Sequence, residues 1–207
     1  MNVELLHADD ACIVVDKPSG LLAVPGRGAH LQDCVASRVQ AMFADALVVH
    51  RLDMATSGLM LFARGAEAQR CLSRAFAQRE VHKRYIAVVH GRVEAAQGEI
   101  DLPLIADWPN RPLQKVDHEH GKPSLTRYRV IGTEGDRTRV ELEPVTGRAH
   151  QLRVHLRAIG HTIVGDALYA TPELLVGTTR LLLHAASLRF AHPVSGEPMA
   201  IESPVPF

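Results

Sequence analysis

The segment 50–58, with the sequence HRLDMATSG, carries residues whose types and spacing could do chemistry. Asp53 offers a carboxylate that could act as a nucleophile or a base, and Arg51 lies two residues before it. A carboxylate nucleophile must stay ionised, and a neighbouring guanidinium favours the ionised form. Taken alone, this pattern is more typical of a loop with a surface ion pair. Whether Asp53 is instead a reactive group depends on the other residues of the chain.

Metal, cofactor and serine chemistry receive little support from the other motifs. The histidines of the segment 118–120 resemble metal ligands, but their spacing matches no zinc pattern, so we expect no metal. The glycine-bearing loop at 25–28 lacks the spacing of a phosphate-binding loop, so we expect no cofactor. A serine hydrolase would need a G-x-S-x-G turn, which the sequence lacks. We therefore expect residues 56–58 only to shape a turn.

Two residues far from Asp53 would complete a site for chemistry on a nucleic-acid base. Arg153 could be the fixed countercharge of Asp53, and Tyr85 could stack on a base that has left its helix. Spacing does not show that the three residues converge. Each also has a plain structural interpretation, as a surface Asp, a packed core Tyr and a solvated helix Arg.

Apolar runs and turn residues predict the elements that would position these groups. Strands are expected at residues 11–16, 46–49, 57–64, 81–90, 125–132, 137–145, 180–190 and 198–202, with one or two short strands near 99–104. Helices are expected at residues 31–43, 66–78 and 149–159, with a short helical turn near 172–175. Strands outnumber helices without regular β-α-β alternation, which favours an α+β fold with a mixed, mainly antiparallel sheet and flanking helices. We expect two halves, divided near residue 95, to pack around a catalytic cleft.

The third expected helix has two different sides at about 100° per residue. One side is apolar and should face the core; it consists of Ala149, Leu152, Leu156 and Ile159. The other side should be solvated; it consists of His150, Arg153 and Arg157.

Composition and length fit a globular protein of one large domain. The chain has 207 residues, of which 46% are hydrophobic. Its three cysteines follow no pattern, which suggests reduced thiols in the cytoplasm. The N-terminus does not look like a signal peptide, and no apolar run is long enough for a membrane span. We also expect the protein to be a monomer.

Charge is balanced over the chain but not along it. The formal net charge is zero, which taken alone argues against a nucleic-acid partner. Residues 64–84, however, hold six basic and two acidic side chains, and residues 148–157 hold three arginines and no acid. Solvated helix faces would explain both clusters equally well.

A resemblance favours a reactive Asp53 over a plain surface ion pair. The segment HRLDMATSG resembles the H-R-L-D-x-x-T-S-G signature of the RluA family of pseudouridine synthases. Further segments are similar to motifs of that family in the same order: VDKPSGL at 15–21, KRYIAVVHG at 83–91, TGRAHQLRVHL at 146–156, GH at 160–161 with GDALY at 165–169, and LHA at 183–185. Thr162 stands where the family usually has Pro. Residues 102–116 and 121–123 look most like its short, dual-specificity members. Like them, residues 1–207 are expected to be one catalytic domain without an S4-type RNA-binding domain.

The resemblance implies an enzyme that isomerises uridine in RNA to pseudouridine without a cofactor or metal. Asp53 would be the nucleophile or base, Tyr85 would stack on the target base, and Arg153 would pair with Asp53. Leu152 would line the pocket, and Arg51 would take the place of the extruded uridine. Further RNA contacts would come from His50, Arg70, Arg74, Lys83, Arg84 and Arg148.

The same resemblance implies two substrates and leaves one competing class of protein. The substrates would be a uridine in a 23S rRNA stem-loop and one in the anticodon stem-loop of certain tRNAs, recognised by their folded shape. The competitor is a non-catalytic module that binds stem-loop RNA on the same fold. Such a module should have lost Asp53, Tyr85 or Arg153, and all three are present.

Overall fold

The computed structural model describes residues 2–207, which form two compact units. The first unit comprises Met1–Lys83 and His184–Pro206, and the second comprises Arg84–Leu183 with Phe207. The predicted division near residue 95 is therefore displaced into strand β5 (His82–His90). The C-terminal strands also return to the first unit, because β11 (Leu183–Ala191) pairs with a strand there.

The sheet of the first unit has the order β1 (Glu4–Ala8), β2 (Cys12–Lys17), β4 (Ser57–Arg64) and β11. Strand β3 (Ala46–Val48) also pairs with β4, and β12 (Pro198–Glu202) pairs with β11. Strand β11 runs parallel to β4, whereas the other pairs of this unit described here are antiparallel. Sequence analysis missed β1, an edge strand that is largely exposed and therefore lacks a buried, alternating pattern.

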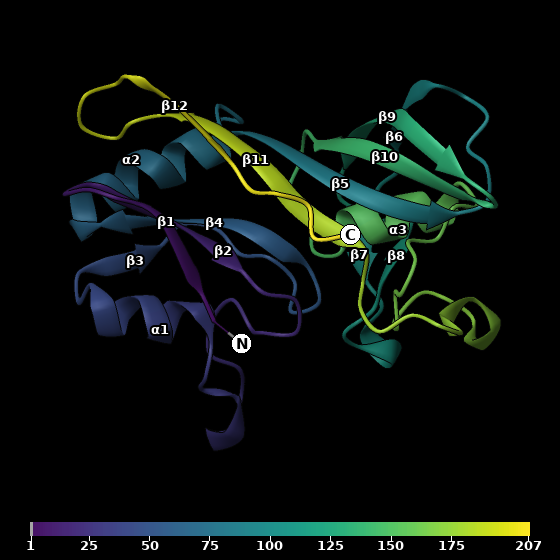
Figure 1. Ribbon diagram of the computed structural model, residues 1–207, viewed down its shortest axis with the longest axis horizontal. Coiled ribbons are helices and arrows are strands. Elements are labelled where there is room, and N and C mark those ends of the chain that lie inside the picture. Colours follow the sequence, from purple (N-terminus) through teal and green to yellow (C-terminus); the bar gives the residue numbers. More distant parts are fainter. Residues whose placement is uncertain (1) are drawn as a thin grey trace. The chain divides into compact units, whose positions relative to one another are not determined.

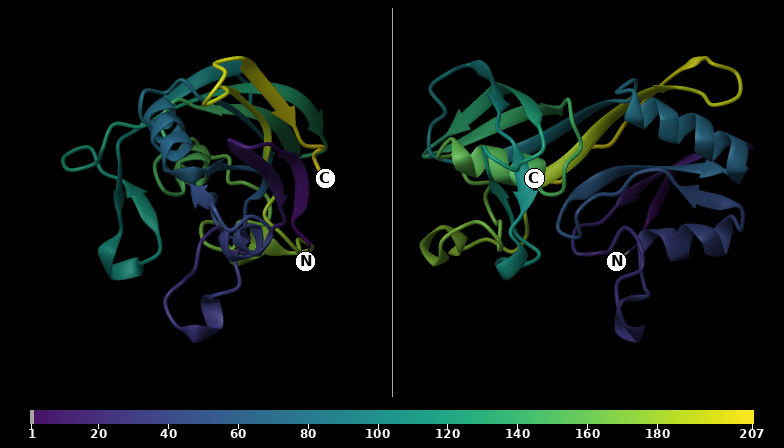
Figure 2. Two further views of the ribbon diagram at one scale, coloured as in Figure 1. Left: turned by 90° about the vertical axis from the view of Figure 1, so that its left-hand side faces the viewer. Right: turned by 180° about the vertical axis from the view of Figure 1, so that it is seen from behind.

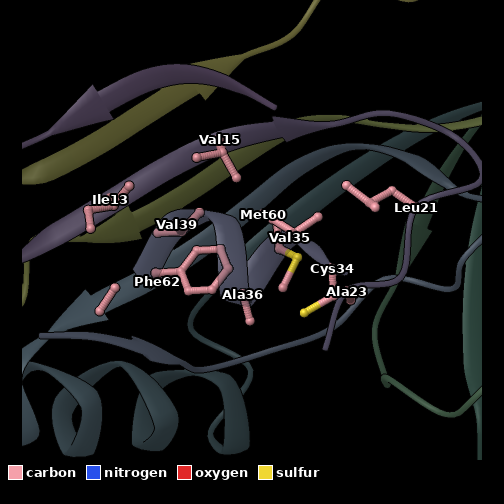
Figure 3. Packing of buried hydrophobic residues seen from close by; sticks show 11 residues of the cluster. Ile13, Val15, Leu21, Ala23, Cys34, Val35, Ala36, Val39, Met60 and Phe62 are labelled. Atoms are coloured by element: carbon pink, nitrogen blue, oxygen red, sulfur yellow. The ribbon is translucent and has the colours of Figure 1, made fainter. Parts of the chain in front are cut away.

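Helices α1 (Val35–Met42) and α2 (Gly65–Ala77) cover opposite faces of this sheet (Figures 1 and 2). Side chains alternate along a strand, so successive residues of β2 enter different cores. Ile13 and Val15 pack with α1, as Figure 3 shows, while Cys12 and Val14 pack with α2. A sheet covered on both faces explains why its central strands are continuous apolar runs.

The second unit contains an antiparallel sheet with the order β5, β10 (Arg137–Pro144), β9 (Leu125–Glu134) and β6 (Gln97–Asp101). A separate hairpin pairs β7 (Leu104–Ala106) with β8 (Gln114–Val116). Helix α3 (Gln151–Ala158) packs against β8, β9 and β10. Strand β8 was not predicted, because sequence analysis expected only one or two short strands near residues 99–104 in this part of the chain.

The fold class is confirmed as α+β with a mixed, mainly antiparallel sheet. Within residues 2–207 the α-helices number three, as expected, and none is long and apolar enough to cross a membrane. The first helix begins at Val35 because Cys34, just before it, and Ser37, in its first turn, form a reciprocal capping box. The solvated side predicted for the third helix is wrong at Arg153, because residues 151–156 are all buried.

Candidate active site

The loop that carries Asp53 lies between β3 and β4 and turns sharply after that residue. The N–H of Thr56 donates to the carbonyl of Asp53 at 3.1 Å, which closes the turn, and the Asp53 side chain is partly exposed. At the start of β4, Gly58 has φ 112° and lies directly against the backbone of Ala185 in β11. A Cβ at this position would collide with that backbone, so glycine is required for the close pairing.

The buried Lys17 fixes the backbone immediately after Asp53. Its ammonium donates to the carbonyls of Pro18 at 3.0 Å, Leu21 at 2.7 Å and Met54 at 2.9 Å. A buried cation is tolerated when its three donors are used in this way. The N–H of Gly20 also donates to the carbonyl of Met54, at 2.8 Å. The segment that follows β2 therefore holds the Asp53 loop in one conformation, which a preorganised catalytic group requires.

A chain of buried hydrogen bonds lies behind the same loop. The Ser57 hydroxyl lies 2.9 Å from Nδ1 of His184, and Nε2 of His184 lies 3.0 Å from the hydroxyl of Ser203. Ser203 donates to the carboxylate of Asp16. It must therefore accept from Nε2–H of His184, which leaves Nδ1 to accept the proton of Ser57. The chain links β4, β11 and β2, and it gives Ser57 a partner in place of the purely turn-forming role that we expected.

His50, expected to contact RNA, is attached to the protein by its ring. Nε2 accepts the N–H of Leu61 at 2.9 Å, and the ring stacks on Phe76 with centroids 4.7 Å apart. The imidazole thus continues the β3–β4 ladder after β3 has ended at Val48. Burial, together with the charge of Lys83, lowers the pKa of His50 to about 3. These contacts make His50 a positioning residue for the loop, and its contact with RNA stays a prediction.

The lowered pKa of His50 predicts a pH dependence of stability. An unfolded His has a pKa of about 6.5, so below that pH the unfolded chain binds a proton that the native His50 excludes. The free energy of unfolding should therefore fall as the pH decreases from about 6.5 towards 3. His50→Gln keeps an acceptor and cannot titrate, so it should flatten this dependence by up to one proton in urea unfolding. His118→Gln, at an exposed loop position, is the control, and equal slopes in wild type and His50→Gln would contradict the prediction.

In the second unit, Arg153 forms a buried two-bond pair with Asp166. Nε of Arg153 donates to Oδ2 at 2.8 Å and an Nη donates to Oδ1 at 2.6 Å, and the two side chains are 4% and 0% exposed. The same carboxylate accepts the N–H groups of Leu168 and Tyr169. Sequence analysis noticed the GDALY segment but did not assign Asp166 as a partner of Arg153.

Tyr169 connects this pair to neighbouring elements of the unit. Its ring lies under the guanidinium of Arg153, with Cζ 5.1 Å from the ring centroid. Its hydroxyl accepts the N–H of Gln114 in β8 at 2.8 Å and lies 2.7 Å from Nδ1 of His150. Arg153 is therefore held in place by ionic, stacking and hydrogen-bonding contacts, as a fixed countercharge must be.

The other expected site residues are distributed over both units. Leu152 is buried on α3, on the side of the helix that periodicity predicted to face the core, and Tyr85 is partly buried in β5 opposite Leu142. Arg51 is exposed beside Asp53. Asp53 belongs to the first unit, and Tyr85, Leu152 and Arg153 belong to the second. Their convergence, and with it the expected pairing of Asp53 with Arg153 and the expected cleft, stays a prediction.

The expected RNA-contacting cations differ in their surroundings. Arg70, Arg74 and Arg148 are exposed, although Arg70 lies 3.4 Å from Glu67. Arg84 is partly exposed and pairs with Glu141 at 3.3 Å. Lys83 is also partly exposed. The exposed members of this set remain the better candidates for phosphate contacts.

One group of the described residues has the types and spacing of metal ligands. Ligand atoms of His7, Asp9 and Cys12 lie within 4.8 Å of one another. Asp9 accepts from His7 at 2.7 Å and from His192 at 3.2 Å, besides the N–H groups of residues 11 and 12. Burial, with the charge of Asp9, raises the pKa of the Cys12 thiol to about 12. The cluster is therefore explained by these hydrogen bonds to Asp9, which close the turn between β1 and β2. The segment 118–120 is an exposed turn.

Both the loop that carries Asp53 and the helix that carries Arg153 lie within the part of the chain that matches a known family. Residues 11–158 match the family described as RNA pseudouridylate synthase, and the chain belongs to this family. It is an enzyme that converts uridine in RNA to pseudouridine, so the non-catalytic alternative is not supported.

Relatives with about half of their residues identical belong to one branch of that family. The dual-specificity RNA pseudouridine synthase RluA of Escherichia coli K12 is 51% identical over 98% of this chain and 93% of its own length. The protein of the same name from Vibrio vulnificus is 53% identical over 93% of this chain and 79% of its own. Among solved structures, Human RNA Pseudouridylate Synthase Domain Containing 1 has a TM-score of 0.83 and 28% identity, covering 100% of this chain and 84% of its own.

Proposed function

We propose that this pseudouridine synthase modifies two RNAs, a stem-loop of 23S rRNA and the anticodon stem-loop of certain tRNAs. The observation that carries this proposal is the 51% identity, over nearly the full length, to a relative named as dual-specificity. Recognition would use the folded shape of the stem-loop, whose unpaired loop bases are accessible to the protein. The proposed compartment is the cytoplasm, where these RNAs are processed, and the proposed state is a monomer.

In the proposed mechanism, the target uridine leaves the RNA stack and enters the site as a flipped base. Asp53 acts on the sugar or the uracil as nucleophile or base. The C1′–N1 bond breaks, the uracil turns, and a C1′–C5 bond forms; the proton leaves C5 and N1 ends protonated, so no atom is gained or lost. The rigid turn that Lys17 fixes supports this role, because the reacting carboxylate must be held in place while the base turns.

The supporting residues have separate proposed tasks. Tyr85 stacks on the flipped uracil, Leu152 forms part of the pocket wall, and Arg153 is the countercharge that keeps Asp53 ionised. Arg51 fills the gap that the uridine leaves, because a planar guanidinium can both stack and donate hydrogen bonds. Exposure of Arg51 beside the Asp53 turn supports this last assignment.

Dual specificity can be tested with two short transcripts, one for each stem-loop, and carbodiimide mapping of pseudouridine. We expect conversion of one uridine in each RNA, and we expect each RNA to inhibit modification of the other competitively, since one site serves both. Transcripts with cytidine at the converted position are the matched controls. Conversion of only one of the RNAs would contradict dual specificity while leaving the reaction itself unaffected.

A further inference from the structure

We propose that Trp108 and Arg111, at the tip of the β7–β8 hairpin, form a platform on which an unpaired base of the substrate RNA stacks. The proposal rests on the proposed function only for the identity of the RNA. It adds a recognition surface, distinct from the candidate catalytic residues, in the second unit.

The large aromatic side chain of Trp108 is unusually exposed to solvent. It is the only tryptophan of the chain, and 65% of its surface is accessible. The Arg111 guanidinium lies over the indole with Cζ 4.2 Å from the ring centroid. A large aromatic ring is usually buried, and when it is presented to solvent it is typical of a binding surface. Stacking of Arg111 also fixes the ring and adds a positive charge beside it.

The turn that bears Trp108 is braced from within. Residues 108–110 form a 3-10 turn between Asp107 and Arg111. The N–H of Asp107 donates to the carbonyl of Leu113 at 2.9 Å, and the N–H of Leu113 donates to the carbonyl of Asn110 at 3.0 Å. The side-chain amide of Asn110 donates to the Asp107 carboxylate at 2.9 Å. A braced turn presents the indole in a fixed orientation, which lowers the entropy lost when a partner binds.

The hairpin is also attached to the helix that carries Arg153. Leu113 and Val116 pack against a small core of Leu104, Val154 and Tyr169. The N–H of Gln114 donates to Tyr169, whose ring lies under Arg153. The Trp108 platform and the candidate countercharge of Asp53 are therefore positioned by the same packed group of residues. A base held on the platform would be at a defined place relative to Arg153.

The chemistry of the platform fits an unpaired nucleotide. Every base has a π-face, so stacking on an aromatic ring needs no particular sequence, but it needs a base that is not already stacked in a duplex. Stem-loops supply such bases in their loops. The Arg111 charge beside the ring suits the phosphate that accompanies each base. An apolar protein partner would gain nothing from that charge, which favours RNA as the partner of the platform.

Because Trp108 is the only tryptophan, intrinsic fluorescence reports on the platform directly. We expect saturating stem-loop RNA to quench the wild-type emission, and a fully paired duplex of similar length to leave it nearly unchanged. Binding is measured independently from the anisotropy of end-labelled RNA. Stem-loop binding without a change in emission, or equal quenching by the duplex, would overturn the proposal.

Variants of the Trp108 platform give a second, independent test of the proposal. Trp108→Ala should weaken stem-loop binding by about five- to hundredfold, which is the effect of losing one stacked base, whereas Trp108→Phe should retain most of the affinity. Val176→Ala, at an apolar residue that is 78% exposed, is the control and should bind as wild type. Wild-type affinity in Trp108→Ala would refute the platform. Failure to convert either transcript would instead count against the proposed substrates, because quenching is read without turnover.

Discussion

Replacing Asp53 by Asn is expected to reduce conversion of uridine in stem-loop RNA by at least about a thousandfold, within the range that one positioned acid–base group contributes. The substitution keeps the size of the side chain and removes its charge and its nucleophilic oxygen. The turn should persist, because its closing hydrogen bond uses the backbone carbonyl of Asp53. The ammonium of Lys17 likewise binds the backbone carbonyl of Met54, which the substitution leaves in place. The measurement is single-turnover conversion, mapped with carbodiimide.

The matched control for this variant is Asp10→Asn. Asp10 is a fully exposed carboxylate of the same unit, 3.7 Å from Arg64, and lies outside the Asp53 loop. We expect wild-type turnover for Asp10→Asn, and stem-loop affinity within a few-fold of wild type for both variants. Turnover near the wild-type rate in Asp53→Asn would remove Asp53 from the reaction. Loss of turnover together with loss of RNA binding would show that Asp53 holds the RNA and is not the reactive group.

Much of the first unit could be predicted because its signals are local. Strand β4 has the predicted bounds, since its apolar run is flanked by the turn at residues 50–56 and by Gly65. The apolar runs on either side of residues 50–56 also located the Asp53 turn correctly between two strands. The contacts that hold this turn were not predictable, because Lys17 and His184 come from distant segments and no period in the sequence links them to Met54 and Ser57.

The second unit shows where helical periodicity misleads. A surface helix has one apolar side, so Arg153 was expected to be solvated. Helix α3 is instead buried over six consecutive residues, and a polar residue there is tolerated only with a partner. The partner of Arg153 lies 13 residues further along the chain, in a loop whose sequence carries no sign of pairing. The same buried pair provides the largest stability effect that we expect.

Replacing Asp166 by Asn should lower the free energy of unfolding by about 3–5 kcal/mol, because the Arg153 charge would stay buried without its countercharge. In a chain of 207 residues this corresponds to a decrease in Tm of about 10 °C. Asn can still accept from Leu168 and Tyr169, so the loss would come mainly from the ion pair. The measurement is thermal and urea unfolding of the full chain.

Glu99→Gln is the matched control, because it neutralises a carboxylate that an arginine Nε contacts at the same distance, but at the surface. Nε of Arg127 lies 2.8 Å from Glu99, and the two side chains are 52% and 56% exposed. Exposed pairs contribute about 0–1 kcal/mol, so Glu99→Gln should change stability little. A decrease for Asp166→Asn no larger than that for Glu99→Gln would show that the buried pair does not stabilise the unit.

A double variant separates the structural role of the pair from its role in catalysis. Replacing both partners of a buried ion pair by apolar residues of similar size is often nearly neutral for stability. Arg153→Met with Asp166→Asn removes both charges and keeps an acceptor for Leu168 and Tyr169, so it should recover much of the stability lost in Asp166→Asn alone. It should not recover turnover, because the proposed countercharge of Asp53 would be absent. Recovery of both would mean that Arg153 serves only to pack α3, and the countercharge of Asp53 would have to be sought among other residues.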